Sequence, residues 1–285
     1  MFRRLFSCSL LLVLCALVST ALAMPPRLSP QASRDLAVLA TAYPGLITAI
    51  TGTPDGRIRV VLNDGTQIPY DDGRIRNDQQ ALEDPDIKTM LEQPYPLGPV
   101  VAEPAAHMSP GRRRVEALFF ALYGHSKAVV AATCQPMPFF NQTIRFNTRY
   151  GAAAAFGRAV ATLQDLVAQH PQYRSFLLPA SGGMVWRTIA GTHRLSVHSF
   201  AAAVDVSPRG NPYWRNLPPG TNLLATRQAF PAAIVEAFER QGFIWGGKWS
   251  EFDLMHFEYR PEIILLARLA RGERLPLVDI TPLLH

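Results

Sequence analysis

Two short stretches, SVHSFAAAVD at 196–205 and DLMHFE at 253–258, decide how this chain is interpreted. In the first, His198 precedes Asp205 by seven positions, and in the second Asp253 precedes His256 by three. A hydrolytic zinc site takes three protein ligands from nitrogen and oxygen donors and leaves the fourth position to water. His198, Asp205 and His256 supply such a set, and Asp253 is then free to accept a proton from the bound water.

Spacing alone leaves other interpretations open. A His-x6-Asp pair often arises by chance, and Asp-x2-His is also typical of a cap or a simple ion pair. The chain has no serine nucleophile elbow, no glycine-rich phosphate loop and no CxxC pair. Cys134 lies between Thr133 and Gln135, which offer no base, so we expect a structural cysteine rather than a nucleophile.

Longer strings around the two stretches are more specific. WRTIAGT at 186–192, followed by LSVHSFAAAVD at 195–205, resembles the first signature of the zinc D-alanyl-D-alanine carboxypeptidase and L-alanyl-D-glutamate endopeptidase family, which includes VanY-like peptidoglycan peptidases. GFIWGGKW at 242–249, followed by DLMHFE, resembles its second signature. The resemblance covers roughly residues 140–270.

The resemblance assigns roles to five side chains. It implies that zinc is bound by His198, Asp205 and His256, and that Asp253 is the catalytic carboxylate. This carboxylate is an aspartate in the endopeptidase-like branch of the family and a glutamate in the carboxypeptidases. Arg187 matches an arginine that stabilises the oxyanion or holds a substrate carboxylate.

Four further residues belong to the same two signatures. Ser196 matches the serine of the first signature and is expected to support the site. Trp245 and Trp249 either line the groove or pack in the core. Glu258 is expected to lie behind the ligands rather than to be one of them.

One position departs from the family pattern. The family usually has glycine three residues after the first zinc histidine, where this chain has Ala201. If that position needs a positive φ, alanine costs about 1 kcal/mol or forces a small backbone shift. All metal and catalytic positions are intact, so we interpret Ala201 as a tolerated variation.

The N-terminus has the pattern of a cleavable signal peptide. Arg3 and Arg4 precede an apolar run at 10–22, and Ala21-Leu22-Ala23 forms a small-x-small cleavage site. The alternative is an N-terminal membrane anchor, but the run is short for a membrane span. We therefore expect residues 1–23 to be removed and the mature protein to be periplasmic or secreted, with no stable membrane span.

Composition limits the remaining possibilities. Of 285 residues, 48% are hydrophobic and 18% charged, which excludes an intrinsically disordered chain, and 24 prolines predict long irregular connections. The formal charge is +6, and loss of residues 1–23 leaves 26 basic against 22 acidic residues. The run Arg112-Arg113-Arg114 is expected to be a solvated face, and nucleic acid is not an expected partner.

Helical and strand patterns do not alternate along the chain, so the predicted class is α+β. The resemblance implies a small antiparallel sheet flanked by helices with a zinc site, as in the Hedgehog/D-Ala-D-Ala peptidase fold. We divide the chain into a signal peptide at 1–23, an N-terminal region at 24–135 and a zinc peptidase domain at 136–285. The N-terminal region is expected to hold a β-hairpin turning at Asn63-Asp64-Gly65, a proline-rich connection at 71–111 and one helix at 112–123.

Shorter elements are predicted from local patterns. A short helix is expected at Asp35–Tyr43 and another near Ile87–Glu92. The C-terminal part is expected to contain helices at Ala152–Gln169, Pro231–Gln241 and Ile263–Arg271. Strands are expected at Ser181–Thr188, Ala203–Ser207 and His256–Tyr259.

These expectations favour an exported zinc metallopeptidase whose partner is a peptidoglycan stem peptide. Asp253 favours L-alanyl-D-glutamate endopeptidase activity, and terminal D-alanine removal is the carboxypeptidase alternative. A second alternative is a non-catalytic zinc-binding cell-wall module, because Hedgehog signalling domains use the same fold in that way. Retention of both Asp253 and Arg187 favours the enzyme.

Overall fold

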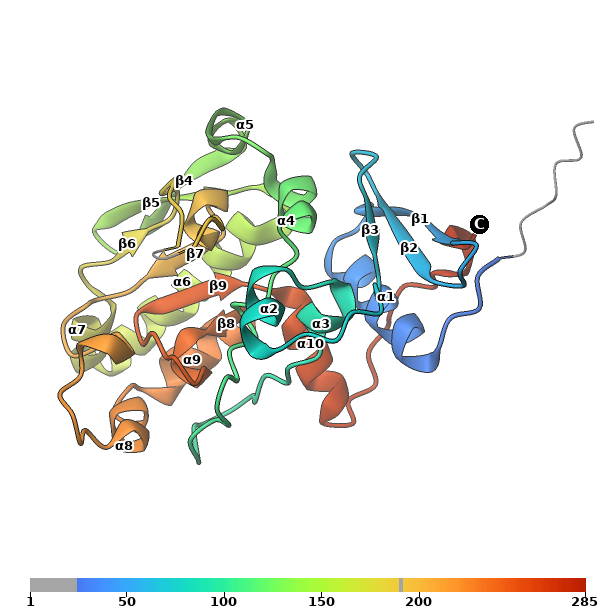
Figure 1. Cartoon of the computed structure of the whole chain (residues 1–285). Coiled ribbons are helices and arrows are strands. Elements are labelled where there is room, and N and C mark those ends of the chain that lie inside the picture. Colours follow the sequence, from blue (N-terminus) through green and yellow to red (C-terminus); the bar gives the residue numbers. More distant parts are fainter. Residues whose placement is uncertain (1–24, 190–191) are drawn as a thin grey trace, which may run out of the picture.

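A four-stranded antiparallel sheet holds both stretches that the sequence singles out. In the computed structural model, which describes residues 25–189 and 192–285, its strand order is β6-β7-β9-β8. The bounds are β6 Ser181–Gly182, β7 Ala203–Asp205, β9 His256–Tyr259 and β8 Phe243–Trp245. Together with the helices around it, this small sheet confirms the predicted α+β class (Figure 1).

Two helices, α6 (Ala152–Gln169) and α9 (Ala232–Glu239), flank this sheet. α6 has the predicted bounds because its apolar residues recur at helical spacing and Pro171 lies just past its end. After α9, Gly242 at φ +87° turns the chain into β8. The ring of Phe238 on α9 stacks on Phe257 of β9 at 4.1 Å between centroids, so α9 covers one face of the sheet.

A hairpin missing from the sequence prediction precedes α6. β4 (Cys134–Phe139) pairs antiparallel with β5 (Gln142–Asn147). β4 contains Pro136 and Pro138, and proline is compatible with an edge strand such as this one. The boundary drawn between residues 135 and 136 therefore falls inside a strand.

The N-terminal unit consists of α1 (Pro30–Ala42) and a three-stranded antiparallel sheet. The strands are β1 Ile47–Gly52, β2 Ile58–Leu62 and β3 Gln67–Pro69. The β2–β3 turn lies at the predicted Asn63-Asp64-Gly65, with Gly65 at φ +84°. α1 begins earlier than predicted because the Ser29 hydroxyl caps it by accepting from the Ala32 amide at 3.1 Å.

The C-terminal end of the chain returns to this N-terminal sheet. Leu284 forms a parallel bridge with Ile50, and the His285 amide donates to the Ile50 carbonyl at 3.0 Å. The helix before this tail, α10 (Pro261–Ala270), packs along α1 (Figure 1). The C-terminal segment of residues 136–285 thus contacts the sheet and the helix of the N-terminal region.

The proline-rich connection wraps the surface and is more regular than its composition predicts. It contains α2 (Asp78–Glu83) as well as the predicted helix near Ile87, here α3 (Ile87–Leu91). α2 begins with a capping box formed by Asn77 and Gln80. With α4 (Glu116–Tyr123) and α5 (Lys127–Ala132), the region at 24–135 holds five α-helices among its described residues, where three were expected.

The arginine run before α4 is not a solvated face, so that prediction is wrong. Arg113 and Arg114 are only 8% and 6% exposed. Arg114 donates to the Leu195 carbonyl at 2.6 Å, and Arg194 donates to the carbonyls of Arg112 and Arg114. These contacts hold residues 112–115 outside the helix, which starts only at Glu116.

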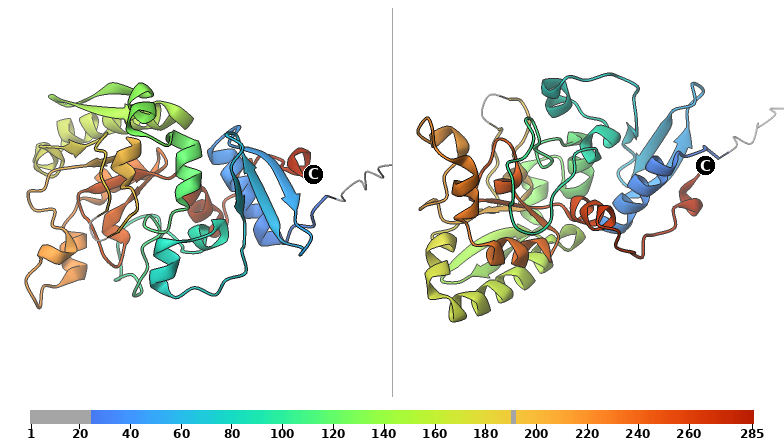
Figure 2. Two further views of the ribbon diagram at one scale, coloured as in Figure 1. Left: turned by 45° about the horizontal axis from the view of Figure 1, so that its top comes forward. Right: turned by 90° about the horizontal axis from the view of Figure 1, so that it is seen from below.

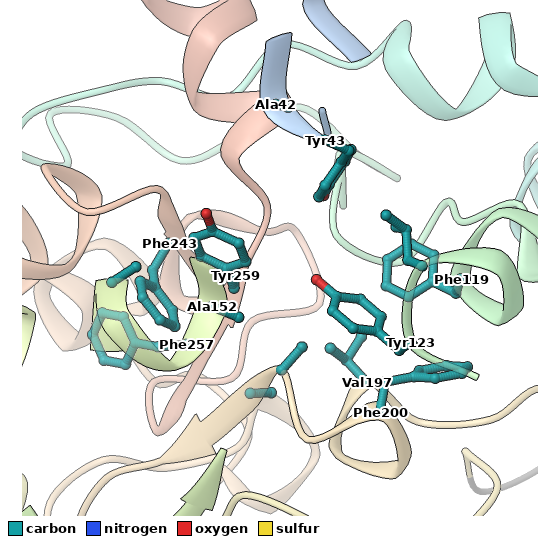
Figure 3. Packing of buried hydrophobic residues seen from close by; sticks show 14 of the residues in the cluster. Ala42, Tyr43, Phe119, Tyr123, Ala152, Val197, Phe200, Phe243, Phe257 and Tyr259 are labelled. Carbon is teal, nitrogen blue, oxygen red and sulfur yellow. The ribbon is translucent and has the colours of Figure 1, made fainter. Parts of the chain in front are cut away.

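One hydrophobic core connects the N-terminal unit with the four-stranded sheet. Tyr43 at the end of α1, Phe119 and Tyr123 of α4, and Tyr259 of β9 belong to the same buried cluster (Figure 3). The two further views show the N-terminal unit at one end of the molecule with α10 beside it (Figure 2). The remaining short elements are η1 Arg149–Gly151, η2 Pro171–Tyr173, α7 Arg174–Leu177, η3 Val197–Phe200, η4 Trp214–Asn216, α8 Leu223–Gln228, η5 Gly246–Lys248 and η6 Thr281–Leu283.

The predicted signal peptide at 1–23 lies outside the described residues. Of the helices within the described ranges, none is long and apolar enough to cross a membrane.

Candidate metal centre

His198 lies on a single turn of 3-10 helix, η3, that directly precedes β7. The turn ends at Ala201, whose φ of +53° and ψ of +37° are left-handed. The positive φ expected for the usual glycine position is therefore present, with alanine in its place. His198 is 2% exposed and packs against Gly182, where a Cβ atom would lie 2.6 Å from the His198 Cε1.

Asp205 and His256 meet because β7 and β9 pair in register. Asp205, the last residue of β7, lies opposite His256, the first residue of β9. Directly opposed residues in an antiparallel pair bring their side chains together on one face. The spacing of Asp205 and His256 in the sequence suggested them as ligands. Their position opposite each other could not be predicted, because it depends on how β7 and β9 pair in the fold.

The three side chains converge on one point. Asp205 Oδ1 lies 3.1 Å from His198 Nε2 and 3.0 Å from His256 Nδ1, and the two nitrogens are 3.3 Å apart. In a tetrahedral zinc site with bonds of about 2.0–2.1 Å, neighbouring ligand atoms are about 3.3 Å apart. His198, Asp205 and His256 could thus hold one metal ion.

The second ring nitrogen of His256 supports the same interpretation. His256 Nε2 lies 3.0 Å from Glu258 Oε2, and Glu258 is 1% exposed. With the proton on Nε2, the lone pair of Nδ1 faces the Asp205 carboxylate and the nitrogen of His198, so three electron-rich atoms point at one another. A cation among them removes this repulsion, and a carboxylate behind the histidine is the usual support for a metal ligand.

Charge distribution in the centre follows from these contacts. Burial opposes ionisation of Asp205, but hydrogen bonds from His198 and His256 hold the pKa of Asp205 well below its usual range. Burial by itself lowers the pKa of His256, whereas its bonds to Asp205 and Glu258 raise that pKa to about 10. Without a metal ion, His256 therefore carries protons on both ring nitrogens at neutral pH, and a metal ion that binds at Nδ1 replaces one of them.

Asp253 lies in the loop that leads from η5 into β9. Its Oδ1 accepts from the Met255 amide at 3.2 Å, and its own amide donates to the Gly246 carbonyl at 3.1 Å. Burial raises the pKa of Asp253, while the charge of His256 opposes this shift. A partly buried carboxyl with a raised pKa beside the group of His198, Asp205 and His256 is suited to accept and return a proton.

Arg187 is exposed, and its guanidinium has no hydrogen-bond partner among the described residues. Its main chain is fixed to the His198 turn: the Arg187 amide donates to the Ser199 hydroxyl, which donates to the Arg187 carbonyl, both at 2.9 Å. Ser196 is buried, and its contact with Arg187 runs through its amide at 2.9 Å rather than through its hydroxyl. Ser199 was missed from the sequence because a buried serine that links two loops has no local pattern.

The two tryptophans have different roles. Trp245 packs on Phe230 and Phe257 and donates from Nε1 to the Leu254 carbonyl at 2.9 Å, so it belongs to the core. Trp249 is 4% exposed and lies against the ring of His256 at 5.6 Å between centroids. Trp249 therefore forms a wall of the candidate centre.

Residues outside the two signatures hold the loop that carries Asp253. Arg227 is 2% exposed and donates to the carbonyls of Gly247, Trp249 and Ser250. The Ser250 amide donates to the Met108 carbonyl at 2.7 Å, which ties the loop to the proline-rich connection. This connection is thus part of the support of the loop.

Comparison with known proteins agrees with the geometry. A family model described as D-alanyl-D-alanine carboxypeptidase matches residues 190–259, a segment that contains His198, Asp205, Asp253 and His256. Neither the curated proteins nor the solved structures yield a match to the chain. Over residues 190–259 the chain is therefore similar to D-alanyl-D-alanine carboxypeptidases, and this similarity supports a peptidase.

Proposed function

We propose that this chain is an exported zinc metallopeptidase that cleaves peptidoglycan stem peptides, with the L-alanyl-D-glutamate bond as the favoured target. The observation that carries the proposal is the convergence of His198 Nε2, Asp205 Oδ1 and His256 Nδ1 within 3.3 Å of one another, inside the segment that matches the family model. The signal-peptide pattern at residues 1–23 supports export, because this substrate lies outside the cytoplasm.

The donor set fits zinc, since two imidazoles and one carboxylate are the nitrogen and oxygen ligands of catalytic zinc sites. When bound, zinc polarises the scissile carbonyl and lowers the pKa of a water molecule towards ~7. Glu258 holds the ring of His256 so that Nδ1 faces Asp205. The buried His198 and the wall formed by Trp249 limit access of other water molecules.

Asp253 is the group that moves the proton. Its carboxylate accepts a proton from the attacking water and passes it to the leaving amine as the C–N bond breaks. The raised pKa of Asp253 assists the first transfer, because a stronger carboxylate base takes up a proton from the water more readily. Arg187, exposed and free of ion pairs among the described residues, supplies a positive charge for the oxyanion or for a substrate carboxylate.

The carboxypeptidase alternative has its own support. The matching family model is described as D-alanyl-D-alanine carboxypeptidase, whereas the aspartate at position 253 favours the endopeptidase. Either reaction uses the same centre, so the difference lies in how the substrate is held beside it.

A muropeptide digest followed by mass spectrometry tests the proposal and separates the alternatives. The zinc-loaded protein is expected to release a stem fragment that begins at D-glutamate, and loss of a single alanine would indicate the carboxypeptidase. Asp253→Asn is expected to abolish cleavage and to keep bound zinc, whereas Asp165→Asn, at an exposed position on α6, is expected to leave cleavage unchanged. Bound zinc without cleavage of any muropeptide would support the non-catalytic module instead.

A further inference from the structure

Glu258 begins a buried chain of polar groups that leads from His256 to the N-terminal helix α1. Its Oε2 contacts His256, and its Oε1 accepts from Arg260 Nη1 at 3.2 Å. Arg260 Nε donates to Glu262 Oε1 at 2.5 Å, and the hydroxyl of Tyr43 donates to Glu262 Oε2 at 2.5 Å. Each of these residues except His256 is at most 1% exposed, so the chain is shielded from water along its length.

The alternation of β9 produces this arrangement. Residues 256 and 258 point to the same face of the strand, because side chains alternate with a period of two. Arg260 then lies at the N-cap of α10, and its guanidinium is also fixed by the Gly111 carbonyl at 3.3 Å and by the ring of Phe119 at 5.2 Å. Arg260 thus joins the four-stranded sheet to the proline-rich connection and to α4.

Tyr43 ends this chain from the opposite side of the core. It follows the last residue of α1, is fully buried and lies in the cluster with Phe119 and Tyr123 (Figure 3). Among the described residues, the Tyr43 hydroxyl is the one side-chain donor to Glu262 Oε2. A buried carboxylate that loses a partner must move or find another, because an unsatisfied buried charge is costly.

We propose that Tyr43 is a positioning residue for the metal centre. Through Glu262 and Arg260 it fixes the carboxylate of Glu258, and this carboxylate orients the ring of His256 so that Nδ1 faces Asp205. The N-terminal unit then contributes to the geometry of the metal centre rather than forming an independent module. This inference rests on the proposed metal centre at His198, Asp205 and His256.

Tyr43→Phe in the full chain tests the inference, with Tyr70→Phe as the matched control. Tyr70 is also buried in the N-terminal unit, and its hydroxyl donates to the carboxylate of Asp35 at 2.7 Å, away from the Glu262 chain. Both variants lose one buried hydroxyl bonded to a carboxylate. The measurements are zinc affinity, by competition with a chromophoric chelator, and the visible absorption spectrum of the cobalt-substituted protein.

Loss of a group that supports a metal ligand typically weakens metal binding about 10- to 100-fold. Because Tyr43 acts on His256 through Glu262, Arg260 and Glu258, we expect Tyr43→Phe to weaken zinc binding about tenfold and to change the cobalt spectrum. Tyr70→Phe is expected to match the wild-type protein in both measurements. Glu262→Gln, which keeps the shape of the side chain and removes its charge, is expected to change both in the same direction as Tyr43→Phe.

The outcomes separate this inference from the proposed function. If Tyr43→Phe and Glu262→Gln match Tyr70→Phe in zinc affinity and cobalt spectrum while the wild-type protein binds zinc, the positioning role is overturned and the metal centre stands. If the wild-type protein binds neither zinc nor cobalt, the proposed function fails and the inference fails with it.

Discussion

Two of the three antiparallel sheets among the described residues, the N-terminal sheet and the sheet of the candidate centre, differ in where they place polar side chains. In the N-terminal sheet, β2 and β3 alternate between exposed or half-buried and buried residues, so one face of the sheet remains in contact with water. In the sheet of the candidate centre, all residues of β8 and β9 are buried, and β9 buries His256 and Glu258 among them. The first sheet needs only hydrophobic packing, whereas the second must compensate charges inside the protein.

Two buried aspartates give the sharpest form of this comparison. Asp35 is 1% exposed in the N-terminal unit, where it accepts from Tyr70 and Arg34, while Asp205 accepts from His198 and His256. We expect Asp205→Asn to lower zinc affinity by at least about 100-fold and to remove peptidase activity, because it removes a ligand rather than a support. Chelator competition and a muropeptide assay measure the two effects.

Asp35→Asn is the control for that change. It is expected to lower the free energy of unfolding by about 1–3 kcal/mol through weakened buried hydrogen bonds, with zinc affinity unchanged. Equal zinc affinity in the two variants would contradict the assignment of Asp205 as a ligand.

A pH series extends the comparison, because zinc binding is expected to displace a proton only in the sheet of the candidate centre. In the metal-free protein, bonds to Asp205 and Glu258 raise the pKa of His256 to about 10, so zinc must displace a proton from His256 at neutral pH. Zinc affinity is therefore expected to rise with pH, about tenfold per pH unit between pH 6 and 8. Calorimetry in buffers of different ionisation enthalpy should show about one proton released per zinc, and a pH-independent affinity would contradict the arrangement at His256.

Substitutions at two glycines of positive φ test how closely the protein packs around His198. Gly182 has φ +89° and lies against His198, while Gly65 has φ +84° with no atom within 4 Å of an added Cβ. Gly182→Ala is expected to displace His198 and to weaken zinc binding about tenfold, as loss of a supporting group does. Gly65→Ala carries only the cost of a left-handed alanine, about 1–2 kcal/mol of unfolding free energy, and should leave zinc affinity unchanged.

Local patterns in the sequence predicted the regular elements and the residue types of the centre. The bounds of α6 and the turn at Asn63-Asp64-Gly65 each depend on neighbours along the chain, and the structure confirms them. The spacing of His198, Asp205 and His256 suggested a set of metal ligands. The resemblance to the zinc peptidase family then implied that the metal is zinc and that Asp253 is the catalytic carboxylate.

Long-range contacts could not be predicted in the same way. The register that sets Asp205 opposite His256, the burial of Arg113 and Arg114, and the chain from Glu258 to Tyr43 join residues far apart in the sequence. Hairpin β4–β5 was not predicted, and the two prolines in β4 make its sequence atypical of a strand. The missed features are those in which tertiary packing overrides local preference.

The smallest expected effect concerns Ala201, where strain lies next to the centre. A left-handed alanine costs about 1–2 kcal/mol of unfolding free energy, and replacing it with glycine removes this cost. The larger conformational entropy of glycine in the unfolded chain offsets part of the resulting stabilisation. Ala201→Gly is therefore expected to raise the free energy of unfolding by about 0.5–1 kcal/mol, with little change in zinc affinity. Chemical denaturation measures this change, and a destabilised variant would show that the methyl group contributes more through packing than it costs in strain.

Anomalous diffraction at the zinc edge tests the central claim most directly. Zinc-loaded crystals are expected to show one strong anomalous peak within bonding distance of His198 Nε2, Asp205 Oδ1 and His256 Nδ1. The acidic group of Asp71, Asp72 and Asp86 serves as an internal comparison, because Lys88 and Arg76 already pair with it. A peak at that acidic group, or no peak at the three predicted ligands, would contradict the account.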